Sequence, residues 1–294
     1  MTLRNYEKKH CWQYDIRLKN YVTDVKLSGL DEDELVSLRC PDFSLQYEPK
    51  ENVFNEIKDF IVRHEWLGKL GLSPTHFFTA RYKDVLAGVV VMDMPNAFSK
   101  MLGENTRKIE RLISRGACIS WSPKNLASSL ISFSTNWMAK NTQYRLFTAY
   151  SDPEARELGT IYQACNFYYL GQKFGAKEQY LIENGKWVSD RYFRSRSVYK
   201  RMAKALEIEW LPEWQGQTGN KDKVNFEHMP VDVAESIKRK SKNYQQSCNV
   251  RQIPPKHKYA FVAGENRKET KELRKQFENL NKVYDYPKER TSNK

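Results

Sequence analysis

The sequence predicts an α/β fold, in which a mixed central sheet is flanked by helices and followed by a basic helical C-terminal extension. Three observations predict this class. Helical and strand-like patterns alternate between about residues 53 and 182. One strand-like segment leads through a short polar loop into a long apolar helix, an order typical of sheets covered by helices. Beyond about residue 187 the chain becomes rich in Arg and Lys.

A helix and a hairpin begin the predicted sheet. Apolar residues recur every three or four positions over 53–64, which predicts a helix. Strand-like runs over 75–81 and 85–92 follow, joined by a turn at 82–84. Within the first fifty residues, 31–38 could form a short helix, and the rest is left unassigned.

A strand, a loop and a helix come next. The alternating run 108–114 predicts a strand that extends to about Ile119, and 126–140 has the apolar spacing of a helix. Ser122, which precedes Pro123, and Asn125 are competing N-caps for this helix. The further predicted elements are strands over 144–150, 168–173, 178–182 and 258–262, and helices over 159–167, 232–244 and 269–280.

The positive charge has an uneven distribution. The chain of 294 residues has a formal net charge of +13, and residues 215–294 contain 18 Lys and Arg against 10 Asp and Glu. A surplus of this sign indicates a polyanionic partner, with nucleic acid ahead of an anionic membrane. We therefore expect three regions: an unassigned N-terminal segment (1–50), a catalytic core (51–190), and a basic, DNA-contacting extension packed on the core (191–294).

Several polar residues stand where predicted elements begin or end. The start of the helix at 126 would present unpaired N–H groups to a phosphate or pyrophosphate, together with side chains of Lys124, Asn125, Ser128 and Ser129. Such an end is common to every helix, and no Gly-rich signature precedes it. Asp152 follows a strand and is either the cap of the next helix or a ligand-facing carboxylate.

Three further residues have two interpretations each. Tyr162 is either an amphipathic core residue or a functional hydroxyl. His64 either interacts with the dipole at the end of its helix or acts as a general base. Arg111 lies in an alternating strand and either pairs with a neighbour on the sheet or faces an anion.

An Arg-rich segment begins at 191. Guanidinium groups pair with phosphates, and its interleaved rings (Tyr192, Phe193, Tyr199) could stack on unpaired bases. A solvated basic helix is the equal alternative. The predicted nucleic-acid contacts are Arg191, Arg194, Arg196, Lys200 and Arg201.

Cysteine usage and hydropathy indicate a cytoplasmic location. The five cysteines are widely separated and form no CxxC pair, so neither a zinc site nor a disulfide framework is expected, and we predict no metal. The longest apolar run, 85–92, is too short to span a bilayer. The N-terminus has no apolar stretch typical of a secretory signal. We expect no membrane partner.

Together the order of elements resembles the GNAT acyltransferase fold, although 120–125 stands in place of that family's Gly-rich loop. Short blocks carry a closer resemblance to the Mom family of phage DNA-modification proteins, a divergent GNAT-like branch. The resemblance spans roughly 57–290, with 215–252 as an insertion. The blocks are HEWLG (64–68), IERL (109–112), PKNLAS (123–128), YSD (150–152), GTIYQACNFYYLG (159–171), KHKY (256–259) and YPK (286–288).

The resemblance implies an activity and its participants. Mom-family enzymes add a carbamoylmethyl (acetamido) group to the exocyclic amine of adenine in DNA, which shields phage DNA from restriction. It implies double-stranded DNA as partner, a phage-infected bacterial cell as location, and acetyl-CoA or a related acyl-CoA as donor. Because a carbamoylmethyl group is attached through carbon, plain acyl transfer from acetyl-CoA is not the whole reaction.

The implied catalytic residues are His64, Arg111, Ser128, Asp152 and Tyr162, and the implied donor-binding residues are Ser122, Lys124, Asn125, Ser128 and Ser129. The target base must leave the duplex stack, and Trp66, Trp121, Tyr168 and Tyr169 could line its pocket. The sequence departs from the family pattern at Glu157 and Leu158, where a polar residue or a His–Gly pair is usual. Ser129 also stands where a larger polar residue is usual.

Two other functions remain open. One is an acetyl-CoA-dependent N-acetyltransferase for a protein or a small molecule, which would leave the basic tail without a role. The other is a non-catalytic nucleic-acid-binding protein that retains the fold.

Overall fold

The structure is a computed structural model that describes residues 11–71, 73–95, 97–103, 108–175, 178–216 and 224–288. The chain packs into two compact units. We call residues 1–174 and 256–294 the core unit, and residues 175–255 the inserted unit. No helix in the described part of the chain is long and apolar enough to cross a membrane.

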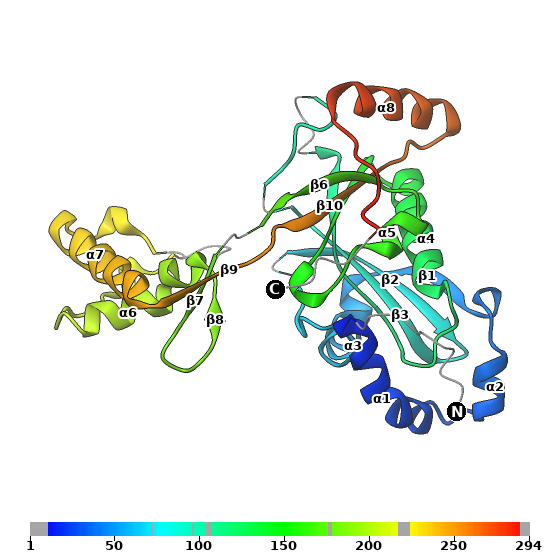
Figure 1. Ribbon diagram of the computed structural model, residues 1–294, viewed down its shortest axis with the longest axis horizontal. Coiled ribbons are helices and arrows are strands. Elements are labelled where there is room, and N and C mark those ends of the chain that lie inside the picture. Colours follow the sequence, from blue (N-terminus) through cyan, green and yellow to red (C-terminus); the bar gives the residue numbers. More distant parts are fainter. Residues whose placement is uncertain are drawn as a thin grey trace. The chain divides into compact units, whose positions relative to one another are not determined.

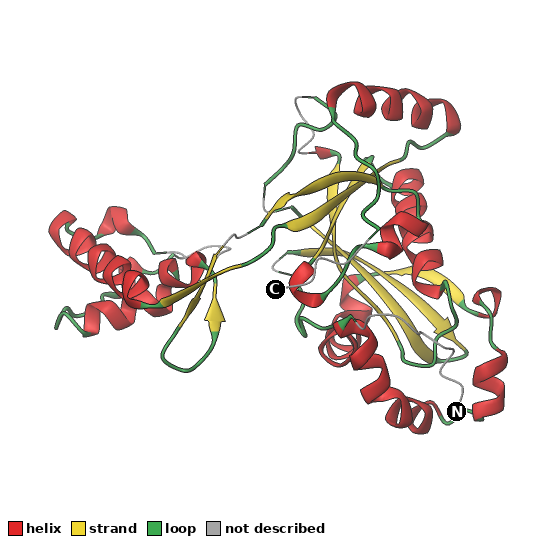
Figure 2. Cartoon of the chain, in the orientation of Figure 1, coloured by secondary structure: helices red, strands yellow, loops and turns green. Residues whose placement is uncertain are grey.

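A seven-stranded sheet forms the centre of the core unit, with strand order β1-β2-β3-β4-β5-β10-β6 (Figures 1 and 2). Its neighbours are antiparallel except for β4 and β5, which are parallel and joined through helix α4. The predicted mixed sheet flanked by helices is thus confirmed, as is the helix that starts after the fourth strand. The strands are β1 (Ser44–Glu48), β2 (Pro74–Tyr82), β3 (Val85–Asp93), β4 (Glu110–Cys118), β5 (Leu146–Ser151), β6 (Tyr168–Phe174) and β10 (Lys256–Val262).

Helices cover both faces of this sheet. On β2, Phe77 contacts Phe54 of α3, while the next residue, Phe78, contacts Phe133 and Trp137 of α4. Because successive strand residues point to opposite faces, α3 and α4 lie on opposite sides of the sheet. The helices of the core unit are α1 (Trp12–Ser28), α2 (Glu32–Ser37), α3 (Lys50–His64), α4 (Leu126–Asn141), α5 (Thr160–Ala164) and α8 (Arg267–Leu280).

The inserted unit has its own sheet and its own apolar core. Its strands pair in the order β8-β7-β9, and its two helices of more than one turn, α6 and α7, enclose a cluster around Met202, Trp214 and Ile237. The elements are β7 (Glu178–Leu181), β8 (Trp187–Val188), α6 (Arg196–Lys204), α7 (Val231–Ser247) and β9 (Asn249–Gln252).

The predicted boundaries between regions were wrong. The expected extension 191–294 divides, because β10 inserts between β5 and β6 and returns residues from 256 onward to the core unit. The strand expected at 178–182 is β7 of the second sheet, so the core ends at Phe174 rather than at 190. The unassigned first fifty residues contribute α1, α2 and the edge strand β1 to the core unit.

The choice between two N-caps is also settled. Helix α4 begins at Leu126, so Asn125 occupies the N-cap position; it adopts a left-handed conformation with φ 74° and its side chain makes no capping hydrogen bond. Ser122 is not the N-cap. It is buried, and its Oγ accepts a hydrogen bond of 3.1 Å from the Arg17 guanidinium of α1.

Candidate active site

The parallel strands β4 and β5 diverge halfway along their length. They pair from Glu110 with Leu146 to Ile113 with Ala149. Beyond that point β4 remains paired with β3 as far as Cys118, while β5 remains paired with β10 as far as Ser151. Among the described residues, the backbone edge of β4 over 114–118 therefore has no strand partner on the β5 side. Ligands of α/β sheets commonly bind at the carboxyl ends of such strands.

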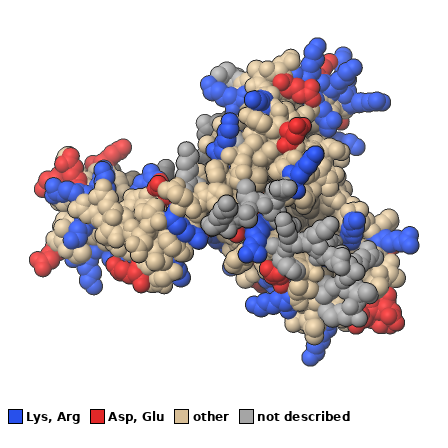
Figure 3. All heavy atoms as spheres, in the orientation of Figure 1, with Lys and Arg blue, Asp and Glu red and all other residues tan. Residues whose placement is uncertain are grey.

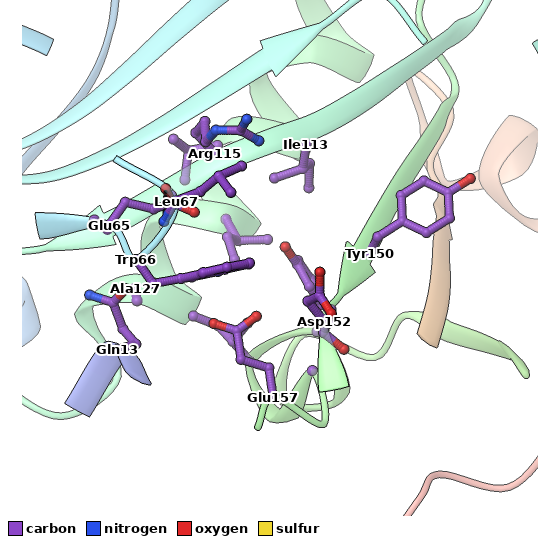
Figure 4. Close-up of a pocket in the computed structure, with 18 of the residues that line it drawn as sticks. Gln13, Glu65, Trp66, Leu67, Ile113, Arg115, Ala127, Tyr150, Asp152 and Glu157 are labelled. Carbon is purple, nitrogen blue, oxygen red and sulfur yellow. Dashed lines mark hydrogen bonds between the residues drawn. The ribbon is translucent and has the colours of Figure 1, made fainter. Parts of the chain in front are cut away.

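A cavity of about 560 Å³ lies at this divergence, within the size range of small-molecule sites (Figure 4). It is built only from residues of the core unit. Both diverging strands, the first turns of α4 and α5, the loop after α3 and the start of α1 contribute to it. Its polar and aromatic lining includes Gln13, Arg17, Glu65, Trp66, Ser114, Arg115, Tyr150, Ser151, Asp152, Glu157, Tyr162 and Lys256.

Three carboxyl groups line this cavity, and two of them have raised pKa values. Burial raises the pKa of Glu157 to about 7, against a hydrogen bond from the Asp152 backbone N–H and the charge of Lys256, while the charges of Glu65 and Asp152 add to the rise. Burial also raises the pKa of Glu65, against the opposing charge of Arg115. Perturbed carboxyl groups that share a cavity are a physical indication of a functional site.

Asp152 caps a helix and also lines the cavity. Its side chain accepts a hydrogen bond of 3.0 Å from the Glu154 N–H and so caps a short 3-10 helix, Pro153–Ala155. It also lines the cavity, where its Oδ2 lies 2.7 Å from Nζ of Lys256. The carboxylate is therefore both a cap and half of an ion pair.

Tyr162 likewise lines the cavity and packs on aromatic residues. Its ring centroid lies 5.4 Å from that of Phe167 and 5.5 Å from that of Tyr259. Burial raises the pKa of Tyr162, followed by the charge of Glu157. The phenol stays protonated at neutral pH and can act as a hydrogen-bond donor.

The structure places His64 and Arg111 outside the lining of this cavity. His64 is buried against Phe60, with Nδ1 3.7 Å from a carboxylate oxygen of Asp24, and burial lowers its pKa to about 4. The Arg111 guanidinium lies 3.6 Å from the Tyr144 ring centroid and donates to the Tyr144 hydroxyl. His64 packs in the protein interior beside Asp24, and Arg111 packs on Tyr144. Neither side chain lines the cavity, contrary to the expectation that both lie at the site.

The five predicted donor-binding side chains also lie outside the lining, although their neighbour Ala127 belongs to it. Ser128 Oγ turns back to donate to the Asn125 carbonyl at 2.9 Å, and Ser122 binds Arg17. Lys124 and Asn125 are exposed, and the Ser129 N–H donates to the Asn125 carbonyl at 2.9 Å. What this helix end offers the cavity is its backbone rather than these side chains.

The predicted nucleic-acid residues belong to the inserted unit, on the 3-10 helix Asp190–Arg194 and on α6. Arg194 pairs with Asp190, while Lys200 and Arg201 lie over the rings of Trp210 and Tyr244. Phe193 and Tyr199 are buried in the apolar interior of this unit and so are not free to stack on bases, while Tyr192 is half-buried against Phe193. Contact of the basic residues with DNA remains a prediction.

Three important lining residues were missed as site residues: Glu65, Glu157 and Lys256. Each lies in or beside a block that the family resemblance had marked, so the signal was present. In HEWLG it is the second and third residues, not His64, that reach the cavity. Of the four aromatic residues expected in the pocket only Trp66 lines it. Trp121 is buried, Tyr168 stacks on Phe277, and Tyr169 bonds His257.

Comparisons with known proteins agree with the sequence resemblance. The model of the Mom protein family matches residues 53–279. Curated proteins give no match. Among solved structures, an N-acetyltransferase from Staphylococcus aureus Mu50 is similar at 19% identity and a TM-score of 0.34, covering 49% of this chain and 92% of that one. A Bacillus subtilis acetyltransferase in complex with CoA is similar at 16% identity and a TM-score of 0.29, covering 50% and 91%.

Proposed function

The chain belongs to the Mom protein family, and on that premise we propose that it is a DNA-modifying transferase. It transfers an acyl-derived, carbamoylmethyl (acetamido) group to the exocyclic amine of adenine and thereby protects DNA from restriction. The observation that carries the proposal is the cavity at the β4–β5 divergence, where three carboxyl groups and Trp66 meet. This lining suits an aromatic amine that must lose a proton.

The amine needs such help because its lone pair is delocalised into the purine ring. A carboxylate that accepts its proton as the new bond forms accelerates the step by about 10² to 10⁴-fold. The adenine must first leave the duplex, at a cost of a few kcal/mol, and be held against an apolar surface. Trp66 supplies that surface, beside the carboxyl group of Glu157 (Figure 4).

The other side of the cavity fits the extended arm of an acyl-CoA donor. The unpaired edge of β4 over 114–118 can bind amide groups of the arm through its backbone, and the start of α4 can bind phosphate. When bound, the donor would supply the carbon under attack and its leaving group. For a carbamoylmethyl product that carbon is the methylene next to the amide carbonyl, because attack at a thioester carbonyl would give an N-acyl group instead. Tyr162, which stays protonated, can donate a hydrogen bond to that leaving group.

Modification of DNA in cells tests this function directly. We expect mass spectrometry of nucleosides from co-expressed plasmid DNA to show a modified deoxyadenosine. With Asp152→Asn or Tyr162→Phe its amount should fall at least tenfold, because the first change removes the negative charge that pairs with Lys256 and the second removes the phenol hydroxyl. Unmodified deoxyadenosine throughout, with duplex binding intact, would support a non-catalytic binder instead. Turnover of acetyl-CoA in the absence of DNA would support a general acetyltransferase.

Binding of DNA has a separate test, because positive charge lies on two surfaces. One is the Arg-rich segment of the inserted unit, and the other is α8, over which Lys and Arg gather in Figure 3. Changing Arg191, Arg194 and Arg196 together to Gln should weaken duplex binding and reduce the slope of log affinity against log salt by about 2 to 3. The matched control changes Lys268, Lys271 and Lys275 of α8. Equal losses in both triple variants would contradict the assignment to the inserted unit.

A further inference from the structure

Asp152 and Glu157 line the same cavity but are held in different ways. We propose that Glu157 is the catalytic base that takes the proton from the acceptor amine, and that Asp152 is a positioning residue. This assignment rests on the proposed function and deepens it. It differs from the sequence analysis, in which His64 was the candidate general base and Asp152 an implied catalytic residue.

Asp152 is already committed to other groups. Its Oδ2 forms the 2.7 Å ion pair with Lys256, and its Oδ1 accepts the 3.0 Å hydrogen bond from Glu154. A cation and a backbone N–H thus already occupy both oxygens of this carboxylate. Protonation of Asp152 during the reaction would break the pair and weaken the cap.

Glu157 differs from Asp152 in that no cation forms an ion pair with it among the described residues. Its carboxyl group accepts a hydrogen bond from the Asp152 backbone N–H, which lowers its pKa, but burial is the larger influence and raises that pKa to about 7. The charges of Glu65 and Asp152 also raise it, and that of Lys256 lowers it. The carboxyl group therefore gains or loses its proton near neutral pH. A base of this strength matches the pH at which it would work.

Hydrogen bonds fix the backbone of the loop at Glu157 and at the next residue, Leu158. The Glu157 N–H donates to the Asp152 carbonyl at 3.1 Å, and the next carbonyl, that of Leu158, accepts from Gln163 Nε2 at 3.2 Å and from the Tyr259 hydroxyl. Two left-handed residues, Arg156 with φ 56° and Gly159 with φ 71°, turn the chain on either side of it. The carboxyl group is therefore presented on a preorganised turn, which catalytic geometry requires.

In the proposed step, the exocyclic nitrogen forms a bond to the electrophilic carbon of the donor. The bond from that carbon to the leaving group breaks, and its electron pair leaves with that group. The proton of the amine passes to a carboxylate oxygen of Glu157. The donor is any carbonyl-bearing compound with a leaving group on the carbon under attack.

The experiment uses the full-length protein, a synthetic adenine-containing duplex, and clarified bacterial extract as the donor source. Initial rates of adenine modification are measured from pH 5.5 to 8.5 at several duplex concentrations. The variants are Glu157→Gln, Asp152→Asn and the control Glu154→Gln, which changes a carboxyl group of the adjoining 3-10 helix that does not line the cavity. Duplex affinity is measured separately by anisotropy.

We expect Glu157→Gln to lower kcat at least 100-fold with duplex affinity changed less than threefold, and to remove the rise in rate between pH 6 and 8. Asp152→Asn should lower the rate while retaining that rise, and Glu154→Gln should resemble the unmodified protein. A Glu157→Gln protein that keeps more than a third of the rate, or that keeps the rise with pH, overturns the assignment. Absence of modification by the unmodified protein would instead overturn the proposed function itself.

Stability provides a readout that needs no donor. The pKa of Glu157 is raised in the folded state, so the neutral form favours folding, and stability is lost as pH rises from about 4.5 through about 7. Glu157→Gln removes that loss. Its thermal midpoint should therefore exceed that of the unmodified protein at pH 8 and approach it at pH 4.5. An equal or lower midpoint at pH 8 contradicts the surroundings described for Glu157.

Discussion

Replacing Gly159 by alanine is expected to lower the free energy of unfolding by about 2 to 4 kcal/mol. Gly159 has φ +71°, a left-handed conformation that costs a side-chain-bearing residue about 1 kcal/mol. A Cβ atom here would lie 2.4 Å from Cε2 of Tyr259 and 2.9 Å from Oγ of Ser151. The Tyr259 ring cannot yield easily, because it is fully buried and its hydroxyl donates to Leu158. Such overpacking costs about 1 to 3 kcal/mol more.

The chain offers a matched control in Gly29, which has φ +65° but nothing within 4 Å of its hypothetical Cβ. Gly29→Ala should therefore cost only about 1 kcal/mol, which is the backbone contribution. Thermal or urea unfolding measures the loss of stability in each variant. The loss in Gly29→Ala reports backbone strain alone, and the additional loss in Gly159→Ala reports the steric overlap with Tyr259 and Ser151. Equal losses of stability would show that Tyr259 and Ser151 do not restrict the turn. Because Glu157 lies two residues before Gly159, we also expect Gly159→Ala to reduce activity.

Replacing Asp24 by alanine is expected to cost about 3 kcal/mol. This carboxylate of α1 is 1% exposed, lies 2.5 Å from the Arg63 guanidinium, and accepts a hydrogen bond from the Ser120 N–H at 3.2 Å. Its removal leaves a buried N–H without its acceptor and a partly buried guanidinium without its counter-charge. Arg63 is about one-third exposed, which places the loss at the lower end of the range for buried pairs.

The effect should extend to the loop before α4. Arg17, two helical turns before Asp24 on α1, donates to the carbonyl groups of Ser120 and Ser122. With Asp24 absent, one of the two attachments between α1 and this loop is lost. Asp59→Ala, at an exposed carboxyl group of α3, is the control and should change stability by less than about 0.5 kcal/mol. A chemical denaturation curve for Asp24→Ala that overlays that of the control would contradict this role.

The sequence was sufficient to predict the elements with strong periodicity. Helices α3 and α4 and the hairpin of β2 and β3 have apolar positions that repeat at one clear period, so their location followed from the pattern. Helix α1 was missed because Val22 and Leu27 are exposed while Asp24 is buried. Its apolar residues therefore do not recur at the helical period along one face. Strand β1 was missed because it is a half-buried edge strand.

Pairing between distant segments could not be predicted. Nothing in the run 256–262 indicates that it lies between β5 and β6, because its partners are set by packing over the whole sheet. For the same reason, site residues that are brought in by long-range pairing could not be predicted. Asp152 was found because it stands at the end of a strand and Tyr162 because the family resemblance implied it, whereas Glu157 lies in a loop whose course depends on Tyr259 of β10. Lys256 enters the cavity only through this long-range pairing.

The central strand β10 imposes an order on folding. Strand β6 ends at Phe174 and its neighbour β10 begins at Lys256, which pairs with it, so 81 residues separate two adjacent strand ends. Nearly the whole chain must therefore be synthesised before β10 can pair with β5 on one side and with β6 on the other. Closing so long a loop costs entropy, but the inserted unit pairs Glu178 with Gln252 and so brings its own ends together. Its prior folding should accelerate completion of the sheet, and damage to its small core should appear first as a slower folding rate of the enzyme.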